Sequence, residues 1–300
     1  MILDELVGML TDPLMQRALL AALLVGLAAP VMGTYLVQRK LSLLGDGIGH
    51  VALTGVALGW LVGNAAGLVE GALAVPGAVV AAVIGAIAIE LVRERGRTSG
   101  DVALALLFYG GIAGGVLLIS LAGGTNANLM AYLFGSISTV SGADLWLTVV
   151  LASIVLLVGV GLRSALFAVC HDEEFARAAG LPVRALNIAI AVIAALTVTV
   201  AMRVVGLLLV SALMIVPVAV AQLVSSSFRR TMSLAMVVGV TVCLAGLSLT
   251  YWQDMSPGAT IVVLAIGVYA LVAGLRPLVR RSRPHDPHPH LPDDVRVGAP

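Results

Sequence analysis

Apolar segments long enough to cross a bilayer recur along the whole chain, and they restrict its fold more than any other feature. Three of the clearest run from Met15 to Val37, from Ala72 to Leu91 and from Val102 to Leu121. A helix of about 20 apolar residues spans the hydrocarbon core of a membrane. Only 11% of the 300 residues are charged, whereas a soluble domain carries about 25%. The sequence therefore predicts an all-α, polytopic integral membrane protein in contact with the lipid bilayer.

About nine transmembrane helices are expected in this fold. The other six cover residues 48–63, 145–162, 183–202, 204–223, 232–250 and 258–275. Residues 1–277 would form one transmembrane domain. Residues 278–300, rich in Pro, His and Asp, are expected to be a disordered cytosolic tail. No cleavable signal peptide is expected, because the first residues lack a basic leader and a small-residue cleavage site.

Arginine and lysine in the short loops predict the orientation of the chain, since such loops stay in the cytosol. When nine spans are assumed, the main basic loops all fall on one side of the membrane. These loops contain Arg39-Lys40, Arg93, the Arg163 to Arg184 segment, Arg229-Arg230 and the arginines after residue 275. The N-terminus is then outside and the C-terminus cytosolic. The net charge of +1 gives no reason to expect a nucleic-acid partner.

An acid and a histidine at the start of the second span are the strongest candidates for a functional site. Asp46 and His50 stand four residues apart in Gly45-Asp46-Gly47-Ile48-Gly49-His50 and would share one helix face. Ionisable groups within a membrane span usually mark a substrate or ion pathway. A carboxylate and an imidazole both bind first-row metal ions. We therefore expect Asp46 and His50 to bind a metal ion in transit.

Two other interpretations of this pair stay open at this stage. Asp46 could be the N-cap of the span, and His50 a hydrogen-bonded core histidine. One chain also supplies only two ligands, whereas a closed zinc site has four. A site that must release its ion is served by few ligands, and two copies facing each other across a dimer axis could supply four.

Small residues favour tight packing of the spans. Gly55, Gly59 and Gly63 repeat every four residues along one helix face, a spacing that lets helix backbones approach closely. The two cysteines, Cys170 and Cys243, have no feature that pairs them, and we expect both to be reduced packing residues.

One polar segment lies between spans, and it predicts a short cytosolic helix that docks on a partner protein. Acidic residues come first and Arg177 later, which suits the helix dipole, and Gly180 with Pro182 ends the helix. Its apolar side is too small for a helix lying in the lipid interface. The segment comprises Asp172, Glu173, Glu174, Phe175, Ala176, Arg177, Ala178, Ala179, Gly180, Leu181 and Pro182.

The C-terminal tail holds a second group of potential metal ligands. His285, His288 and His290 could make weak metal contacts, but the interspersed prolines oppose a preformed site. An inert solvated tail is the alternative.

No catalytic motif is visible in the chain, so we do not expect an enzyme. There is no His-Glu-x-x-His helix, no Gly-x-Ser-x-Gly elbow and no Walker motif. An intramembrane enzyme would need a catalytic pair or a closed metal site. An ion-coupled secondary transporter could use Asp46 and His50 as a proton relay, but we find no inverted hydropathy repeat of the kind such transporters carry.

Four stretches together resemble the membrane permease of ATP-binding-cassette (ABC) importers for zinc, manganese and iron, the metal-ion ABC-3 permease family. The resemblance covers about residues 15–277. Its most specific parts are Arg39-Lys40-Leu41-Ser42-Leu43-Leu44-Gly45-Asp46-Gly47-Ile48-Gly49-His50, Leu129-Met130-Ala131-Tyr132-Leu133-Phe134-Gly135, Glu174 to Pro182, and Val205-Gly206-Leu207-Leu208-Leu209-Val210-Ser211-Ala212-Leu213-Met214-Ile215-Val216-Pro217.

The resemblance implies a fold like that of the cobalamin and siderophore importer permeases, in a bacterial plasma (inner) membrane. It implies a permease dimer, two cytosolic ATPase subunits that bind and hydrolyse ATP, and an extracytoplasmic metal-binding protein. It assigns the metal ligands to Asp46 and His50, and the coupling helix to the segment near 172–182. No cofactor is bound permanently, since the metal ion is the cargo.

The identity of the cargo is predicted from finer details of the same stretches. Leu129 to Gly135 and Val51-Ala52-Leu53-Thr54-Gly55 are closer to zinc members, because manganese members often have a proline where Thr54 stands. This favours zinc, with manganese or iron import by the same fold as the alternative. Gly49 departs from the serine or alanine that is usual before the histidine, but it leaves the spacing of Asp46 and His50 intact.

Overall fold

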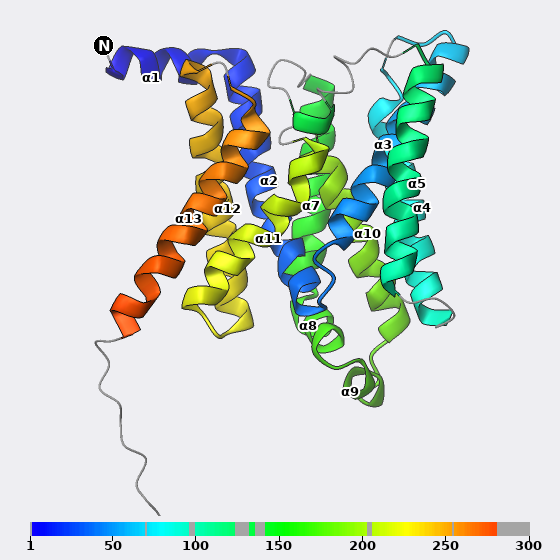
Figure 1. Ribbon diagram of the computed structural model, residues 1–300, viewed down its shortest axis with the longest axis vertical. Helices are drawn as coiled ribbons and strands as arrows, with labels where there is room; N and C mark the ends of the chain where they lie inside the picture. The colour runs from blue at the N-terminus through cyan, green and yellow to red at the C-terminus, as the bar shows by residue number, and fades with distance from the viewer. Residues whose placement is uncertain are drawn as a thin grey trace, which may run out of the picture.

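The computed structural model describes residues 2–69, 71–95, 100–123, 132–135, 142–202, 206–253 and 255–280. The regular elements in these ranges are helical (Figure 1): α1 (Ile2–Thr11), α2 (Pro13–Gln38), α3 (Leu44–Ala65), α4 (Ala74–Arg95), α5 (Gly100–Leu121), α7 (Gly142–Gly161), α8 (Arg163–His171), α9 (Glu173–Ala178), α10 (Val183–Ala201), α11 (Leu207–Val224), α12 (Phe228–Trp252) and α13 (Pro257–Arg280).

The nine predicted spans correspond to nine of these helices, so the all-α membrane fold is confirmed. Within the described residues, eight helices are long and apolar enough to cross a membrane: α2, α3, α4, α5, α7, α10, α12 and α13. The ninth, α11, carries a shorter apolar stretch, Leu209–Val224. The boundaries differ from the predicted ones by a few residues, because helices continue past the last apolar side chain into capping turns.

Two short helices were not predicted from the sequence. α1 precedes the first span and lies across the end of the bundle (Figure 1). Asp12 then caps α2 by accepting a hydrogen bond from the Leu14 amide at 2.9 Å, with Pro13 at the first helical position. α8 follows α7 directly and precedes the predicted polar segment, in a stretch for which the sequence analysis predicted no helix.

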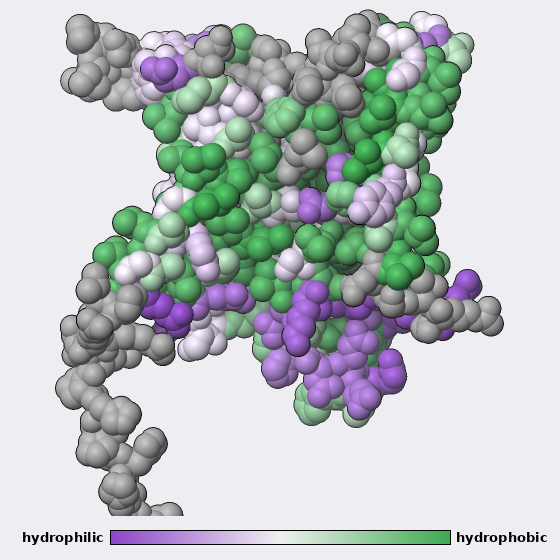
Figure 2. All heavy atoms as spheres, viewed as in Figure 1, coloured by the Kyte–Doolittle hydropathy of each residue, from purple (hydrophilic) through white to green (hydrophobic). Residues whose placement is uncertain are grey.

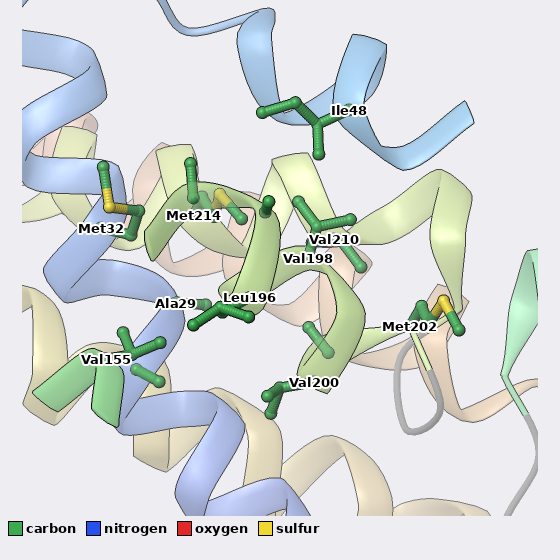
Figure 3. Close-up of a cluster of buried hydrophobic side chains, with 14 of the residues drawn as sticks. Ala29, Met32, Ile48, Val155, Leu196, Val198, Val200, Met202, Val210 and Met214 are labelled. Atoms are coloured by element: carbon green, nitrogen blue, oxygen red, sulfur yellow. The ribbon is translucent and has the colours of Figure 1, made fainter. Parts of the chain in front are cut away.

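The buried core joins helices that are far apart in the sequence. α3 packs against α4 and α5, and α2 packs against α12, α11 and α7. Figure 3 shows Ile48 of α3 facing Val210 of α11, near Val198 of α10. Ile48, midway between Asp46 and His50, is thus part of the core where three helices meet. Its burial fixes the orientation of the start of α3.

The two ends of the bundle differ in character. Apolar residues cover the visible sides of the molecule, whereas hydrophilic residues gather at the lower end over α8 and α9 (Figure 2). The end of α4, the turn between α11 and α12, and the end of α13 lie at this lower end, and α1 lies at the upper one (Figure 1). The described loops predicted to be basic are therefore at one end of the molecule, together with α9.

Candidate functional site

A tight turn at the end of α2 places the beginning of α3. The Leu41 amide donates to the Leu36 carbonyl at 2.8 Å, and the Leu44 amide donates to the Leu41 carbonyl at 3.0 Å. Lys40 has a φ of 58°, in the left-handed region, which turns the chain sharply here. α3 therefore begins within a few residues of the end of α2, and Asp46 lies in its first turn.

Asp46 is not the N-cap of this helix. The capping position is Leu43, which makes no side-chain cap hydrogen bond, and Asp46 follows inside the helix. Its Oδ1 atom instead accepts a hydrogen bond from the Ser211 hydroxyl of α11 at 2.5 Å. A hydroxyl donating to a carboxyl oxygen is a common way to orient a buried acidic side chain. Asp46 is half-buried, and its carboxyl group has a second oxygen that can accept a hydrogen bond or bind a metal ion.

Ser211 was missed in the sequence analysis because its contact with Asp46 joins residues 165 positions apart. One signal could have found it. Ser211 is the single polar side chain in the stretch from Val205 to Pro217, which carries part of the family resemblance. A hydroxyl within such an apolar run needs a hydrogen-bond partner in the protein.

His50 is buried, with 5% of its surface exposed, and its Nδ1 atom has no hydrogen-bond partner in the described part of the chain. The ring makes a T-shaped contact with Phe108 of α5, with 4.5 Å between the ring centres. Leaving a buried polar atom unpaired costs free energy, so such atoms usually mark a ligand or functional site. A neutral imidazole nitrogen in this setting is suited to bind a metal ion.

α5 approaches the backbone of His50 closely at Gly111. A Cβ atom added to Gly111 would lie 2.6 Å from the carbonyl carbon of His50, well inside van der Waals contact. Thr54 reinforces the approach, because its hydroxyl donates to the Gly111 carbonyl at 2.9 Å. The position of His50 is therefore fixed by the packing of α3 against α5.

The two predicted ligands lie on the same helix face, but they do not form a complete metal site. In the described ranges, no group of three His, Cys, Asp or Glu side chains is close enough together to hold a metal ion. One copy of the chain thus offers one carboxylate, one imidazole and the Ser211 hydroxyl beside them.

The predicted glycine face of α3 lies against the start of α4 at two of its three positions. A Cβ at Gly55 would overlap the Gly77 carbonyl, and one at Gly59 would overlap the Leu73 carbonyl. Gly63 is less constrained, since its nearest neighbour is the Leu73 side chain at 3.9 Å.

The predicted cytosolic helix corresponds to α9, which is shorter than the sequence suggested. Asp172 caps it by accepting hydrogen bonds from the amides of Glu174 and Phe175, at 3.0 and 2.9 Å. Gly180, with a φ of 79°, ends it before the helix can continue. Pro182 then occupies the N-cap position of α10.

The exposed surface of α9 is the side turned away from the bundle. Ala176 is buried against the bundle, whereas Phe175 is 67% exposed. An open cleft of about 450 Å³ lies beside α9 and the start of α10, lined by Arg177, Pro182, Arg184 and neighbouring apolar residues. Exposed aromatic side chains and arginines are enriched at protein–protein interfaces, so this surface of α9 is suited to docking a protein.

The cysteines and the tail histidines are separate candidates for metal binding. Cys170 and Cys243 are both free thiols. Burial raises the pKa of Cys170 in α8 to about 12, so its thiol stays protonated and is a poor metal ligand. His285, His288 and His290 lie outside the described residues.

Comparison with known proteins decides the family. The profile of the ABC 3 transport family matches residues 11–275. The chain belongs to this family. The resemblance predicted from the sequence is therefore confirmed, and the protein is a permease subunit of ABC transport and not an enzyme.

Individual relatives agree with this assignment. The manganese transport system membrane protein MntC of Halalkalibacterium halodurans is 34% identical over 257 residues, which cover 86% of this chain and 85% of that protein. The chelated iron transport system membrane protein YfeD of Yersinia pestis is 32% identical over 253 residues, covering 84% and 82%. The solved structure of PsaBC from Streptococcus pneumoniae in complex with Fab matches with a TM-score of 0.79 and 29% identity, covering 91% of this chain and 95% of that one.

Proposed function

We propose that the protein is the permease of an ATP-driven importer for divalent transition-metal ions, and that Asp46 and His50 bind the ion during its passage. The observation that supports this most directly is the state of these two side chains. His50 is buried with an unpaired nitrogen, and Asp46 is held by Ser211 with a second oxygen free to bind. The names of relatives in the family, which include manganese and iron transport proteins, support a metal cargo.

The small number of metal ligands is suited to an ion in transit and not to a permanently bound ion. One copy brings a carboxylate, an imidazole and a hydroxyl, fewer protein ligands than a closed metal site has. An ion bound by so few ligands can leave again, as conduction requires. A second copy of the permease, related by a dimer axis, would double the set while the pathway is closed. Alternating access would then expose Asp46 and His50 to one side of the membrane at a time.

The difference between the two ends of the bundle supports the proposed partners. α9, with Phe175 exposed, would dock in a cytosolic ATPase subunit that binds and hydrolyses ATP. This orientation puts the C-terminus in the cytosol and the N-terminus outside. An extracytoplasmic metal-binding protein would deliver the ion at the opposite end.

The cargo is the finer part of the proposal. The sequence favours zinc, whereas several relatives are named as manganese transport proteins. Oxygen ligands suit manganese, and the imidazole of His50 suits zinc or iron. Uptake of radioactive zinc and manganese in competition, by the complete importer, separates these cargoes.

The proposed site is tested by replacing its ligands in the complete importer reconstituted in liposomes. Asp46→Asn and His50→Gln keep side-chain size but remove the carboxylate and the imidazole. We expect each to abolish metal uptake while the complex with the ATPase still assembles. His171→Gln, a histidine substitution in α8 outside the spans, is the matched control and should transport normally. Normal uptake by the double variant Asp46→Asn/His50→Gln would refute the site.

A further inference from the structure

A buried arginine contacts the helix that faces the proposed ATPase and precedes, by a short turn, the helix that carries the proposed metal site. Arg39 lies just after α2, and its side chain is only 5% exposed. Its Nη2 atom is 3.5 Å from Glu90 Oε1 of α4 and 3.2 Å from Glu173 Oε1 of α9. One guanidinium thus joins the ends of two helices that are not neighbours in the sequence.

The charges around Arg39 are balanced. The Glu90 carboxylate is 4% exposed and is also paired with Arg93, at 3.0 Å. We call Arg39, Glu90, Arg93 and Glu173 the Arg39 cluster; it contains two positive and two negative groups. A buried charge is stable only with partners that compensate its lost hydration. The position of Glu173, and with it α9, is therefore tied to the place where Arg39 is buried.

A second contact holds Glu173 in the same place. The buried Asn187 of α10 donates from Nδ2 to Glu173 Oε1 at 3.2 Å. Glu173 is the first residue of α9, directly after its cap Asp172. Both contacts thus act on the N-terminal end of α9, and a displacement of that end must move or break them.

Arg39 is also close in sequence to the proposed metal site. The turn of residues 40–43 is closed by the backbone hydrogen bonds of Leu41 and Leu44, and Asp46 follows in the first turn of α3. There is no flexible loop in which a displacement of Arg39 could be absorbed. A shift at Arg39 would therefore change the position of the first turn of α3.

We propose that Arg39 is a positioning residue that transmits movement of α9 to the first turn of α3, and so couples the ATPase to the metal site. The coupling part of this inference rests on the proposed function, because it requires that α9 docks on an ATPase and that α3 carries the metal site. A nearby ion pair provides a contrast: Arg184 of α10 and Glu94 of α4 are 3.2 Å apart, but Arg184 is 69% exposed and the pair does not include α9.

The decisive variant is Glu173→Gln, because it removes the charge that links α9 to Arg39 while the buried pair of Arg39 and Glu90 remains. Glu173 is 44% exposed, so the variant should fold. In the reconstituted importer we expect ATP hydrolysis to continue while metal ions transported per ATP fall at least fivefold. Arg39→Lys keeps the positive charge but loses the planar guanidinium that can bind two carboxylates at once. It should also lower the number of metal ions transported per ATP. Glu94→Gln is the control and should keep the wild-type ratio.

A second measurement on the permease alone separates this inference from the proposed function. Hydrogen exchange in lipid nanodiscs reports local opening without an ATPase or a metal ion. We expect Glu173→Gln to speed exchange both in α9 and in residues 40–49, and Glu94→Gln to change neither. A change confined to α9, or a wild-type number of ions per ATP in Glu173→Gln, would overturn the role of Arg39. A wild-type importer without ATP-driven metal uptake would instead refute the proposed function.

Discussion

Two polar clusters lie within this apolar bundle, and they are built on opposite principles. The α3 cluster, Asp46, His50 and Ser211, contains a buried imidazole nitrogen without a partner and a carboxylate with one hydroxyl donor. In the Arg39 cluster, each of the four charged groups lies within ion-pair distance of an opposite charge. An incompletely paired cluster has capacity for a ligand, whereas a fully paired one holds elements together. This difference supports the proposal that the α3 cluster binds the ion and the Arg39 cluster maintains the geometry.

The largest effect is expected from breaking the paired cluster at its centre. Glu90→Gln leaves Arg39 and Arg93 without their shared carboxylate, and removing one partner of a buried ion pair typically costs about 3–5 kcal/mol. We expect this loss in the free energy of unfolding of the purified permease, measured by thermal or denaturant unfolding in detergent. A change below about 1 kcal/mol, the size expected for an exposed pair, would mean that the cluster is hydrated and does not hold the helices.

The next effect concerns Ser211, the partner of the carboxylate proposed to bind the ion. Ser211→Ala removes the hydroxyl that orients Asp46, and loss of a group that orients a metal ligand typically lowers metal affinity about 10- to 100-fold. We expect a rise of this size in the metal concentration for half-maximal uptake, with unfolding little changed.

Ser211→Thr serves as the control for this variant because it keeps a hydroxyl. It should retain most of the affinity lost in Ser211→Ala. Equal affinities for wild-type protein and Ser211→Ala would show that the contact between Ser211 and Asp46 has no part in binding.

A similar effect is expected where α5 meets His50. Gly111→Ala places a methyl group against the His50 backbone, and overpacking of this kind costs about 1–3 kcal/mol. Both stability and metal uptake should fall, because α3 must shift. The neighbouring Gly110 has nothing within 4 Å of an added Cβ, so Gly110→Ala is a closely matched control. Equal behaviour of the two variants would contradict the close packing of α5 on His50.

The smallest effect is expected at the exposed pair of Arg184 and Glu94. Glu94→Gln should change the free energy of unfolding by only about 0.2–1 kcal/mol, since solvent screens an exposed ion pair. Unfolding in the same assay as Glu90→Gln measures the contrast directly. A loss as large as that of Glu90→Gln would show that burial does not distinguish the two pairs.

Local sequence patterns were sufficient to predict the spans and the pairing of Asp46 with His50 on one helix face. They were also sufficient for the end of α9, where Gly180 has the left-handed conformation that stops a helix. Contacts between distant segments could not be obtained in this way. Ser211 and Asp46 meet only because α11 packs against α3, and no local pattern records this packing.

The role of Arg39 illustrates the same limit. In the sequence, Arg39 and Lys40 are one basic loop that sets the orientation of the chain. The fold separates them: Arg39 is buried between two carboxylates, whereas Lys40 takes the left-handed conformation of the turn. The short helices α1 and α8 were missed for another reason, since neither is long enough to cross a membrane.

The anchoring of Glu173 by Arg39 and Asn187 has a consequence for permease chimaeras. A designer who wishes to direct this transporter to a different ATPase would exchange the segment from Asp172 to Pro182 for that of another permease. The outward residues, such as Phe175, are free to change with the new partner. On the proposed role of Arg39, the acid at position 173 should be retained, because without it the transplanted helix would lose its contacts with Arg39 and Asn187.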